Sequence, residues 1–219
     1  MSRHSSQTRH AGFAPRAFFL SDAVTERLPE IDWQSADVAR RVAGGRRQPL
    51  ARACGVGSIN PLRLLDATGG YGRDAFVLAA LGAEVTLCER LPMLANALQQ
   101  AHQRALESAA VADIAARMRI EPQDAIDWLP QTSAAFDVIY LDPMYAAPGQ
   151  RARAKAPLET LRHLTDGDPD ADHLANLAWE HARRRVVIKR APKAPVLLDR
   201  KVSYVLKSNR VRYDIYVRS

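Results

Sequence analysis

Cysteine is scarce in this chain, which has only Cys54 and Cys88 among its 219 residues. Two cysteines are too few for a disulfide framework, and neither they nor the six histidines follow the spacing of metal ligands. The sequence also has no run of about 18 apolar residues that could cross a membrane, and Ala17–Leu20 is too short for a signal-peptide core. We therefore expect a cytoplasmic protein that binds neither a metal nor a membrane.

The balance of charge is basic, with 31 lysines and arginines against 24 aspartates and glutamates. The formal net charge is +7 and the pI is near 9.8. Such a balance favours a polyanionic partner such as RNA, although many arginines and lysines simply cover solvated surface. The basic residues gather in five clusters: Arg40-Arg41, Arg46-Arg47-Arg52, Arg151-Arg153-Lys155, Arg183-Arg184-Arg185 and Lys189-Arg190-Lys193.

The tetrapeptide Asp142-Pro143-Met144-Tyr145 follows the apolar run Val138–Leu141. At the end of a buried strand, this pattern suits a site that grips the amino group of a nucleobase. The carboxylate and the proline-fixed backbone carbonyls can accept the two amino hydrogens, while the tyrosine ring offers a stacking face. An ordinary strand end gives the same pattern, because Asp-Pro commonly starts a turn and a buried tyrosine usually belongs to the core.

A glycine-rich loop upstream favours a nucleotide-like cofactor. The short apolar strand Arg63–Leu65 leads into Asp66 and then into glycines at positions 69, 70 and 72. Glycines let the backbone turn tightly and approach a ligand closely. Glu89 follows the next apolar strand. It lies about 20 residues after the glycine loop, the offset at which an acidic side chain binds a ribose diol. Asp66 would repel a pyrophosphate and attract a cationic amino-acid group, which favours S-adenosylmethionine (SAM) over NAD.

The alternation of strand and helix patterns predicts one α/β domain over residues 31–219 with a short basic helical lead-in at 31–60. Residues 1–30 are rich in serine and arginine and are expected to be flexible. Helices are predicted at Asp74–Leu81, Pro92–Ala110 and Asp170–His181. Strands are predicted at Arg63–Leu65, Glu84–Cys88, Met118–Glu121, Phe136–Leu141 and Arg185–Lys189, followed by a hairpin of Lys201–Leu206 and Val211–Val217.

Several blocks together resemble one bacterial family. They are Asp66–Leu78, Glu89–Pro92, Tyr140–Tyr145, Val186–Arg190 and Arg212–Tyr216, in an order and spacing similar to the small-subunit ribosomal RNA guanine-N2 methyltransferases of the RsmJ type. The resemblance covers about residues 31–217. It implies a Rossmann-like methyltransferase fold, a mostly parallel sheet finished by an antiparallel hairpin. It also implies SAM as cofactor and 16S ribosomal RNA, or the small ribosomal subunit, as partner.

The tetrapeptide, the glycine loop, the basic clusters and the resemblance together assign roles to individual residues. Asp142, Pro143 and Tyr145 are the expected catalytic residues. The expected cofactor-binding residues are Asp66, Gly70, Gly72, Arg73, Asp74, Glu89, Arg90, Asp124, Ala125 and Asp142. Asp124 and Asp74 have an alternative role as helix caps, and Arg73 has one as a solvent-facing side chain. The expected RNA-binding residues are Arg46, Arg47, Lys189 and Arg190.

Three other functions fit part of these features. An adenine-N6 methyltransferase, or another nucleic-acid amino methyltransferase, would use nearly the same tetrapeptide, but a DNA adenine-N6 methyltransferase usually has a larger recognition region than this chain has room for. A dehydrogenase fits Glu89 but not the loop that begins at Asp66. A noncatalytic RNA-binding assembly factor would explain the charge, yet it leaves the Asp66, Glu89 and Asp142 constellation without a purpose.

Overall fold

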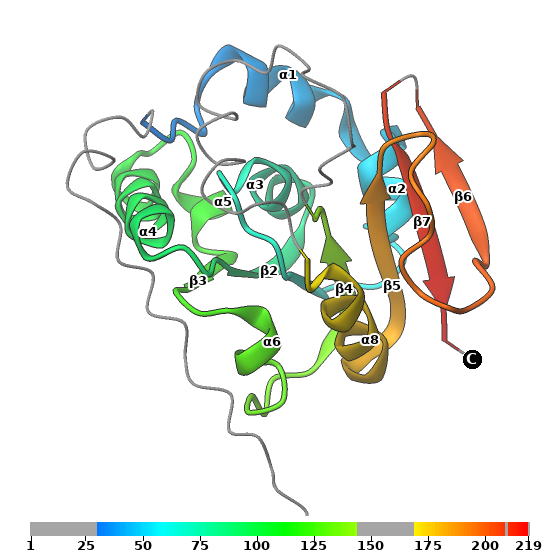
Figure 1. Ribbon diagram of the computed structural model, residues 1–219. Coiled ribbons are helices and arrows are strands. Elements are labelled where there is room, and N and C mark those ends of the chain that lie inside the picture. Colours follow the sequence, from blue (N-terminus) through cyan, green and yellow to red (C-terminus); the bar gives the residue numbers. More distant parts are fainter. Residues whose placement is uncertain (1–29, 144–168, 209, 219) are drawn as a thin grey trace, which may run out of the picture.

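The computed structural model describes residues 30–143, 169–208 and 210–218. Its centre is a seven-stranded sheet in the order β3-β2-β1-β4-β5-β7-β6 (Figure 1). The first five strands are parallel, and β7 runs antiparallel to both β5 and β6. The strands are β1 (Leu62–Asp66), β2 (Ala83–Cys88), β3 (Met118–Glu121), β4 (Phe136–Leu141), β5 (Ala182–Arg190), β6 (Tyr204–Lys207) and β7 (Arg212–Val217).

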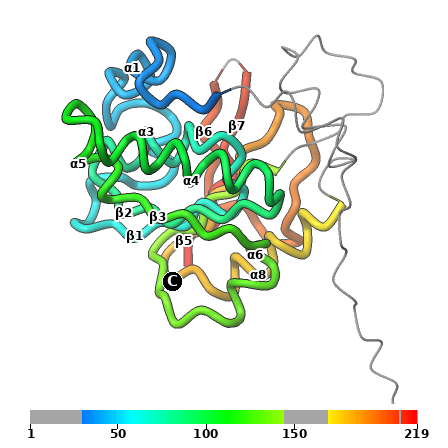
Figure 2. Tube along the Cα trace, turned by 90° about the vertical axis from the view of Figure 1, so that its left-hand side faces the viewer, coloured from blue at the N-terminus to red at the C-terminus, as the bar shows by residue number. Residues whose placement is uncertain are grey.

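Helices cover both faces of the sheet, with α3 and α4 on one side and α6 and α8 on the other (Figures 1 and 2). None of the helices in the described ranges is long and apolar enough to cross a membrane. The helical segments are α1 (Ala36–Ala43), η2 (Gly45–Arg47), α2 (Pro49–Cys54), α3 (Arg73–Ala80), α4 (Pro92–Glu107), α5 (Ala112–Ala115), α6 (Ala125–Trp128) and α8 (Ala171–His181).

Alternate side chains of the central strands pack into two separate hydrophobic cores, one on each face of the sheet. Leu64 and Val138 join the core under α3 and α4, whereas Leu65 and Ile139 join the core under α6 and α8. This alternation arises because successive side chains of a strand point to opposite faces. Since both faces are covered, the middle of the central strands is apolar, as in Leu64-Leu65 of β1 and Val138–Leu141 of β4.

The structure confirms the predicted fold class, including the antiparallel hairpin at the end of the chain. Most boundaries differ from the predictions by one residue, and three differ by more. β5 begins at Ala182 rather than Arg185, the predicted strand Lys201–Leu206 begins at Tyr204, and the predicted helix Pro92–Ala110 ends at Glu107, before the separate helix α5. Residues 1–29 lie outside the described residues, so the flexible segment at the start of the chain stays a prediction.

The topology brings three acidic residues to one edge of the sheet. Asp66 is the last residue of β1, Glu89 follows β2, and Asp142 follows β4. These three strands are neighbours and parallel, so their carboxyl ends meet. The strand order reverses between β1 and β4, and ligands of open α/β sheets bind at such a switch point.

Candidate active site

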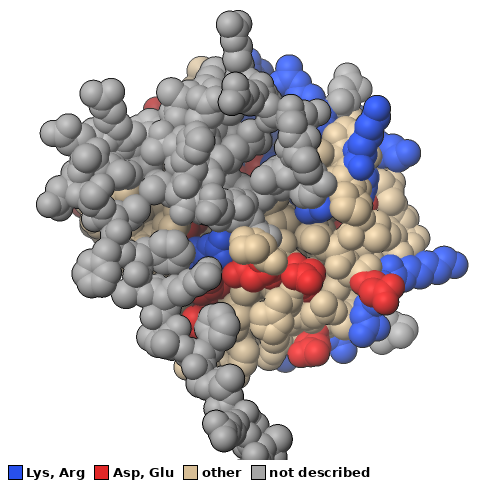
Figure 3. Space-filling view, viewed as in Figure 1, with Lys and Arg blue, Asp and Glu red and all other residues tan. Residues whose placement is uncertain are grey.

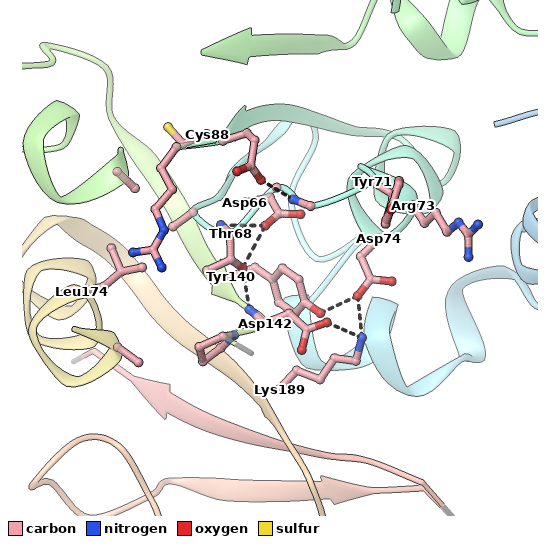
Figure 4. Close-up of a pocket in the computed structure, with 18 of the residues that line it drawn as sticks. Asp66, Thr68, Tyr71, Arg73, Asp74, Cys88, Tyr140, Asp142, Leu174 and Lys189 are labelled. Atoms are coloured by element: carbon pink, nitrogen blue, oxygen red, sulfur yellow. Dashed lines mark hydrogen bonds and ion pairs between the residues drawn. The ribbon is translucent and has the colours of Figure 1, made fainter. Parts of the chain in front are cut away.

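A cavity of about 490 Å³ opens at this edge of the sheet. Figure 4 shows its polar residues, which come from the ends of β1, β2, β4 and β5 and from the loop before α3. The cavity is lined by Pro143 and by all of the expected cofactor-binding residues except Gly72, namely Asp66, Gly70, Arg73, Asp74, Glu89, Arg90, Asp124, Ala125 and Asp142. Tyr145 lies outside the described residues, so its stacking role stays a prediction.

The glycine loop is held against the end of β2. The Gly69 amide donates to the Cys88 carbonyl at 2.8 Å, and a Cβ on Gly69 would lie 2.8 Å from that same oxygen. Gly72 begins α3 with a φ of 67°, and a Cβ there would lie 2.9 Å from Trp33 Cζ2. Gly72 is therefore needed for the turn and for close packing. It does not line the cavity, and its contact with the cofactor stays a prediction.

Glu89 lies beside this loop and is only 8% exposed. Its Oε2 accepts from the Gly70 amide and its Oε1 from the Leu91 amide, each at 2.8 Å. These bonds fix the carboxylate at the cavity wall. A carboxylate held beside a glycine loop after the second strand is the usual acceptor for the hydroxyls of a ribose, which fits the predicted role of Glu89.

Asp66 lies on the cavity floor and is 2% exposed. Burial, assisted by the neighbouring Asp74 carboxylate, raises the pKa of Asp66 to about 8. Its Oδ1 accepts from the Thr68 amide at 3.1 Å. A cationic group arriving beside Asp66 would favour the ionised carboxylate, which fits the amino-acid end of SAM.

Asp142 belongs to a network of charged groups that the sequence did not reveal. Its backbone amide donates to Thr68 Oγ1 at 2.7 Å, and its Oδ2 accepts from Lys189 Nζ at 2.6 Å. Lys189 also donates to Asp74 Oδ2 at 3.0 Å, and the Tyr140 hydroxyl donates to the same oxygen at 2.5 Å (Figure 4). The β4 and β5 strands thus place the carboxylate of Asp142 next to a half-buried cation.

Asp74 is the centre of this network rather than a helix cap. Its Oδ1 accepts from Arg41 of α1, and its Oδ2 accepts from Tyr140 and Lys189. Burial alone would raise the pKa of Asp74, but the Lys189 and Arg41 cations hold it below its ordinary value. Burial opposes the charge of Lys189 as well, yet the carboxylates of Asp142 and Asp74 raise its pKa. Asp74 and Lys189 are therefore both charged at neutral pH.

Comparison with known proteins identifies the family. The family model described as "Putative SAM-dependent methyltransferase" matches residues 19–218. The ribosomal RNA small subunit methyltransferase J of Ectopseudomonas mendocina is 45% identical over 178 residues, which cover 81% of this chain and 68% of that protein. The protein of the same name from Chromohalobacter salexigens is 37% identical over 217 residues, 97% of this chain and 80% of that protein. The chain belongs to the methyltransferase J family.

Solved structures agree with this assignment. A SAM-dependent methyltransferase from Neisseria gonorrhoeae superposes with a TM-score of 0.67 at 29% identity, over 86% of this chain and 74% of that one. A 16S rRNA N2 methyltransferase from T. thermophilus gives a TM-score of 0.55 at 20% identity, over 84% of this chain and 43% of that one, which shows the shared fold. As a member of this SAM-dependent family, the chain uses SAM as its cofactor.

Arg90 and Asp124 lie at the α6 and α8 side of the methyltransferase site. Asp124 caps α6 by accepting from the Ile126 amide at 2.9 Å, so its expected capping role is confirmed. Arg90 Nη1 lies 3.1 Å from Asp170 and 3.9 Å from Asp124. A contact between Asp124 and the adenine amino group stays a prediction. In the part of the chain that the structure describes, no group of three or more His, Cys, Asp or Glu side chains could hold a metal ion.

The four expected RNA-binding residues do not share one surface. Lys189 lies inside the site, and Arg190 is 4% exposed, with its guanidinium donating to the Pro195 carbonyl at 3.1 and 3.2 Å. Arg46 donates to the Leu81 carbonyl at the carboxyl end of α3, which is the end remote from the cavity. Arg47 is exposed beside it. The burial of Arg190 argues against its contact with an RNA phosphate. The ion pairs of Lys189 with Asp74 and Asp142 indicate a role inside the site for this lysine.

Sequence reasoning missed Arg41, Thr68 and Tyr140 as parts of this methyltransferase site. Arg41 looked like one more basic residue on an amphipathic helix, and Tyr140 looked like core. Each owes its role to a partner far along the chain, such as Asp74, which is 33 residues from Arg41 and 66 from Tyr140. A weak signal existed for Tyr140, because it is the one hydroxyl-bearing side chain within the apolar run that leads to Asp142.

Proposed function

We propose that this methyltransferase transfers a methyl group from SAM to the N2 amino group of a guanosine in 16S ribosomal RNA. The observation that carries the proposal is that Asp142 and Pro143 line the same cavity as Glu89 and Asp66. One cavity thus holds both the acceptors for an amino group and the residues expected to bind the cofactor. The relatives named ribosomal RNA small subunit methyltransferase J support this RNA as the substrate, and such a reaction belongs to the cytoplasm.

The residues of this chain supply orientation. When bound, SAM supplies a methyl group that its sulfonium has already activated. Glu89 would hold the ribose hydroxyls and Asp66 the cationic amino-acid end. The Asp142 carboxylate and the Pro143 carbonyl would accept the two amino hydrogens of guanine, which orients the nitrogen lone pair and stabilises the positive charge that develops on it. Asp142 or water then takes the released proton.

The guanine has to leave its stack to reach the cavity, at a cost of a few kcal/mol. We assign the compensating stacking contact to Tyr145, from its place three residues after Asp142. Adenine-N6 methylation is the second candidate, because an adenine amino group would make the same two hydrogen bonds. The methyltransferase J relatives favour guanine in ribosomal RNA over a DNA substrate.

Labelled methyl transfer to small subunits that lack the modification tests the proposal. We expect the label in the small-subunit RNA, and none in large-subunit RNA or DNA offered at the same concentration. RNA binding with no transfer of label would contradict an enzymatic role and favour the noncatalytic assembly factor.

We also propose that the RNA backbone lies across the mouth of the cavity. Lysine and arginine side chains gather over α1 and over the turn between β6 and β7 (Figure 3). Arg73 and Arg210 are exposed and line the cavity. Arg73 lies over the Tyr71 ring, with its guanidinium carbon 5.8 Å from the ring centroid. Arg46 and Arg47 remain candidate contacts on a more remote surface.

Salt dependence of RNA binding separates these surfaces. Replacing Arg73 and Arg210 by glutamine should lower the slope of log affinity against log salt by roughly 0.7 to 0.9 for each phosphate that the protein no longer neutralises. A smaller change is expected for Arg46 and Arg47, because Arg46 is bound to the Leu81 carbonyl.

Arg63 and Arg117 serve as the matched control pair, because neither lines the active-site cavity and both lie near the amino ends of their strands. Their double variant should keep the wild-type slope. Equal slopes for all three pairs and the wild type would mean that the tested arginines are solvated surface.

A further inference from the structure

Lys189 lies where two carboxylates of the site meet. It comes from β5, and its Nζ lies 2.6 Å from Asp142 Oδ2 and 3.0 Å from Asp74 Oδ2 (Figure 4). Its side chain is 21% exposed. The neighbouring strand β4 carries Asp142 immediately after its end at Leu141. An ammonium group in this place lines the cavity and contacts the residue that we expect to hold the acceptor amine.

The two carboxylates differ in how firmly they are held. Asp74 is 13% exposed and is also bound by Arg41 and by the Tyr140 hydroxyl, so three elements besides its own helix fix its position. Asp142 is 40% exposed and follows the end of a strand. The ion pair with Lys189, at 2.6 Å, favours the rotamer of this partly exposed aspartate that keeps its Oδ2 beside the ammonium. Lys189 therefore transmits the fixed position of Asp74 to Asp142.

We propose that Lys189 is a positioning residue, which holds the Asp142 carboxylate in the orientation that accepts the amino hydrogens of the target base. This inference rests on the proposed function. The charges of the network support it, because two cations, Arg41 and Lys189, face two anions, Asp74 and Asp142. Because these charges balance, Lys189 and Asp142 can both stay ionised at a largely buried place without a counterion from solvent.

A purely structural role would have Lys189 only neutralise Asp74. A double-mutant cycle of Lys189→Met and Asp74→Asn distinguishes the two roles, because the second substitution removes the charge that would need neutralising. The rate of methyl transfer to small-subunit RNA is measured in a single turnover at saturating SAM and RNA. Equilibrium dissociation constants for SAM and RNA, and the melting temperature, are measured for each variant.

We expect Lys189→Met to slow methyl transfer about 100-fold, the size of effect that a misplacement of about 1 Å causes. RNA affinity should stay within about threefold of the wild type, because phosphate contacts dominate it. In the Asp74→Asn background, Lys189→Met should again slow transfer by at least about tenfold, because Asp142 still loses its anchor. Lys193→Met, at an exposed lysine four residues away, is the matched control and should transfer at the wild-type rate.

Three results would overturn the inference. If the double variant is as fast as Asp74→Asn alone, Lys189 only neutralises Asp74. If Lys189→Met weakens RNA binding with unchanged transfer at saturation, Lys189 is a phosphate contact. If Lys189→Met is folded and transfers within about threefold of the wild type, the ion pair has no part in positioning. A wild-type protein that transfers no methyl group to the RNA would instead contradict the proposed function itself.

Discussion

Replacing Asp142 by alanine is expected to reduce methyl transfer by more than about 100-fold, the loss seen when one preorganised group at a developing charge is removed. The carboxylate follows β4 at the cavity wall, and its Oδ2 is already oriented by Lys189. The variant should still fold, because the side chain is 40% exposed and Lys189 keeps its ion pair with Asp74. Single-turnover rates at saturating RNA measure the effect.

RNA affinity supplies the control for this variant. It should stay nearly at the wild-type value, because phosphate contacts dominate RNA affinity and one base contact adds little. Asp113→Ala, at an exposed aspartate that does not line the cavity, should leave the rate unchanged. Turnover of Asp142→Ala within about tenfold of the wild type, a loss of roughly 1.4 kcal/mol in the barrier, would show that the grip on the amino group is not the source of catalysis.

Replacing Glu89 by alanine should weaken SAM binding by about 1–3 kcal/mol, the usual cost of leaving buried hydrogen-bonding groups without a partner. The loss has two parts. The ribose hydroxyls would lose their acceptor, and the Gly70 and Leu91 amides would lose the carboxylate that they now share. Titration calorimetry with SAM gives the affinity, and the melting temperature of the cofactor-free protein reports the second part.

Glu84→Ala is the matched control for this change. Glu84 lies on β2, the strand that Glu89 follows, but its side chain is 51% exposed and does not line the active-site cavity. Its removal should leave SAM affinity unchanged. If Glu89→Ala binds SAM with wild-type affinity, Glu89 does not bind the ribose hydroxyls of the cofactor.

Strand and helix patterns predicted most of the fold because both depend on local periodicity. The apolar runs before Asp66, Glu89 and Asp142 marked the three strands whose ends form the site. The first residues of β5 were not predicted as strand because Arg183–Arg185 is a run of charged residues without an apolar pattern. Two of these arginines are exposed, so their polarity does not indicate that the segment pairs with β4.

The partners inside the site could not be predicted in the same way. Lys189 belongs to a basic cluster in the sequence, and the cluster suggested RNA contact. The structure places its ammonium beside Asp74, which is 115 residues away, and beside Asp142, which is 47 residues away. Contacts of that separation depend on strand order, and alternation along β5 alone does not tell which face holds the cavity.

The identity of the methylated nucleoside distinguishes guanine-N2 methylation from the alternatives. Small subunits that lack the modification are incubated with the wild-type protein and methyl-labelled SAM, the RNA is digested to nucleosides, and the labelled product is identified by mass spectrometry. We expect N2-methylguanosine from 16S ribosomal RNA, with no such product from the Asp142→Ala variant. Label in N6-methyladenosine, or no label in the RNA of the small subunit, would contradict guanine-N2 methylation.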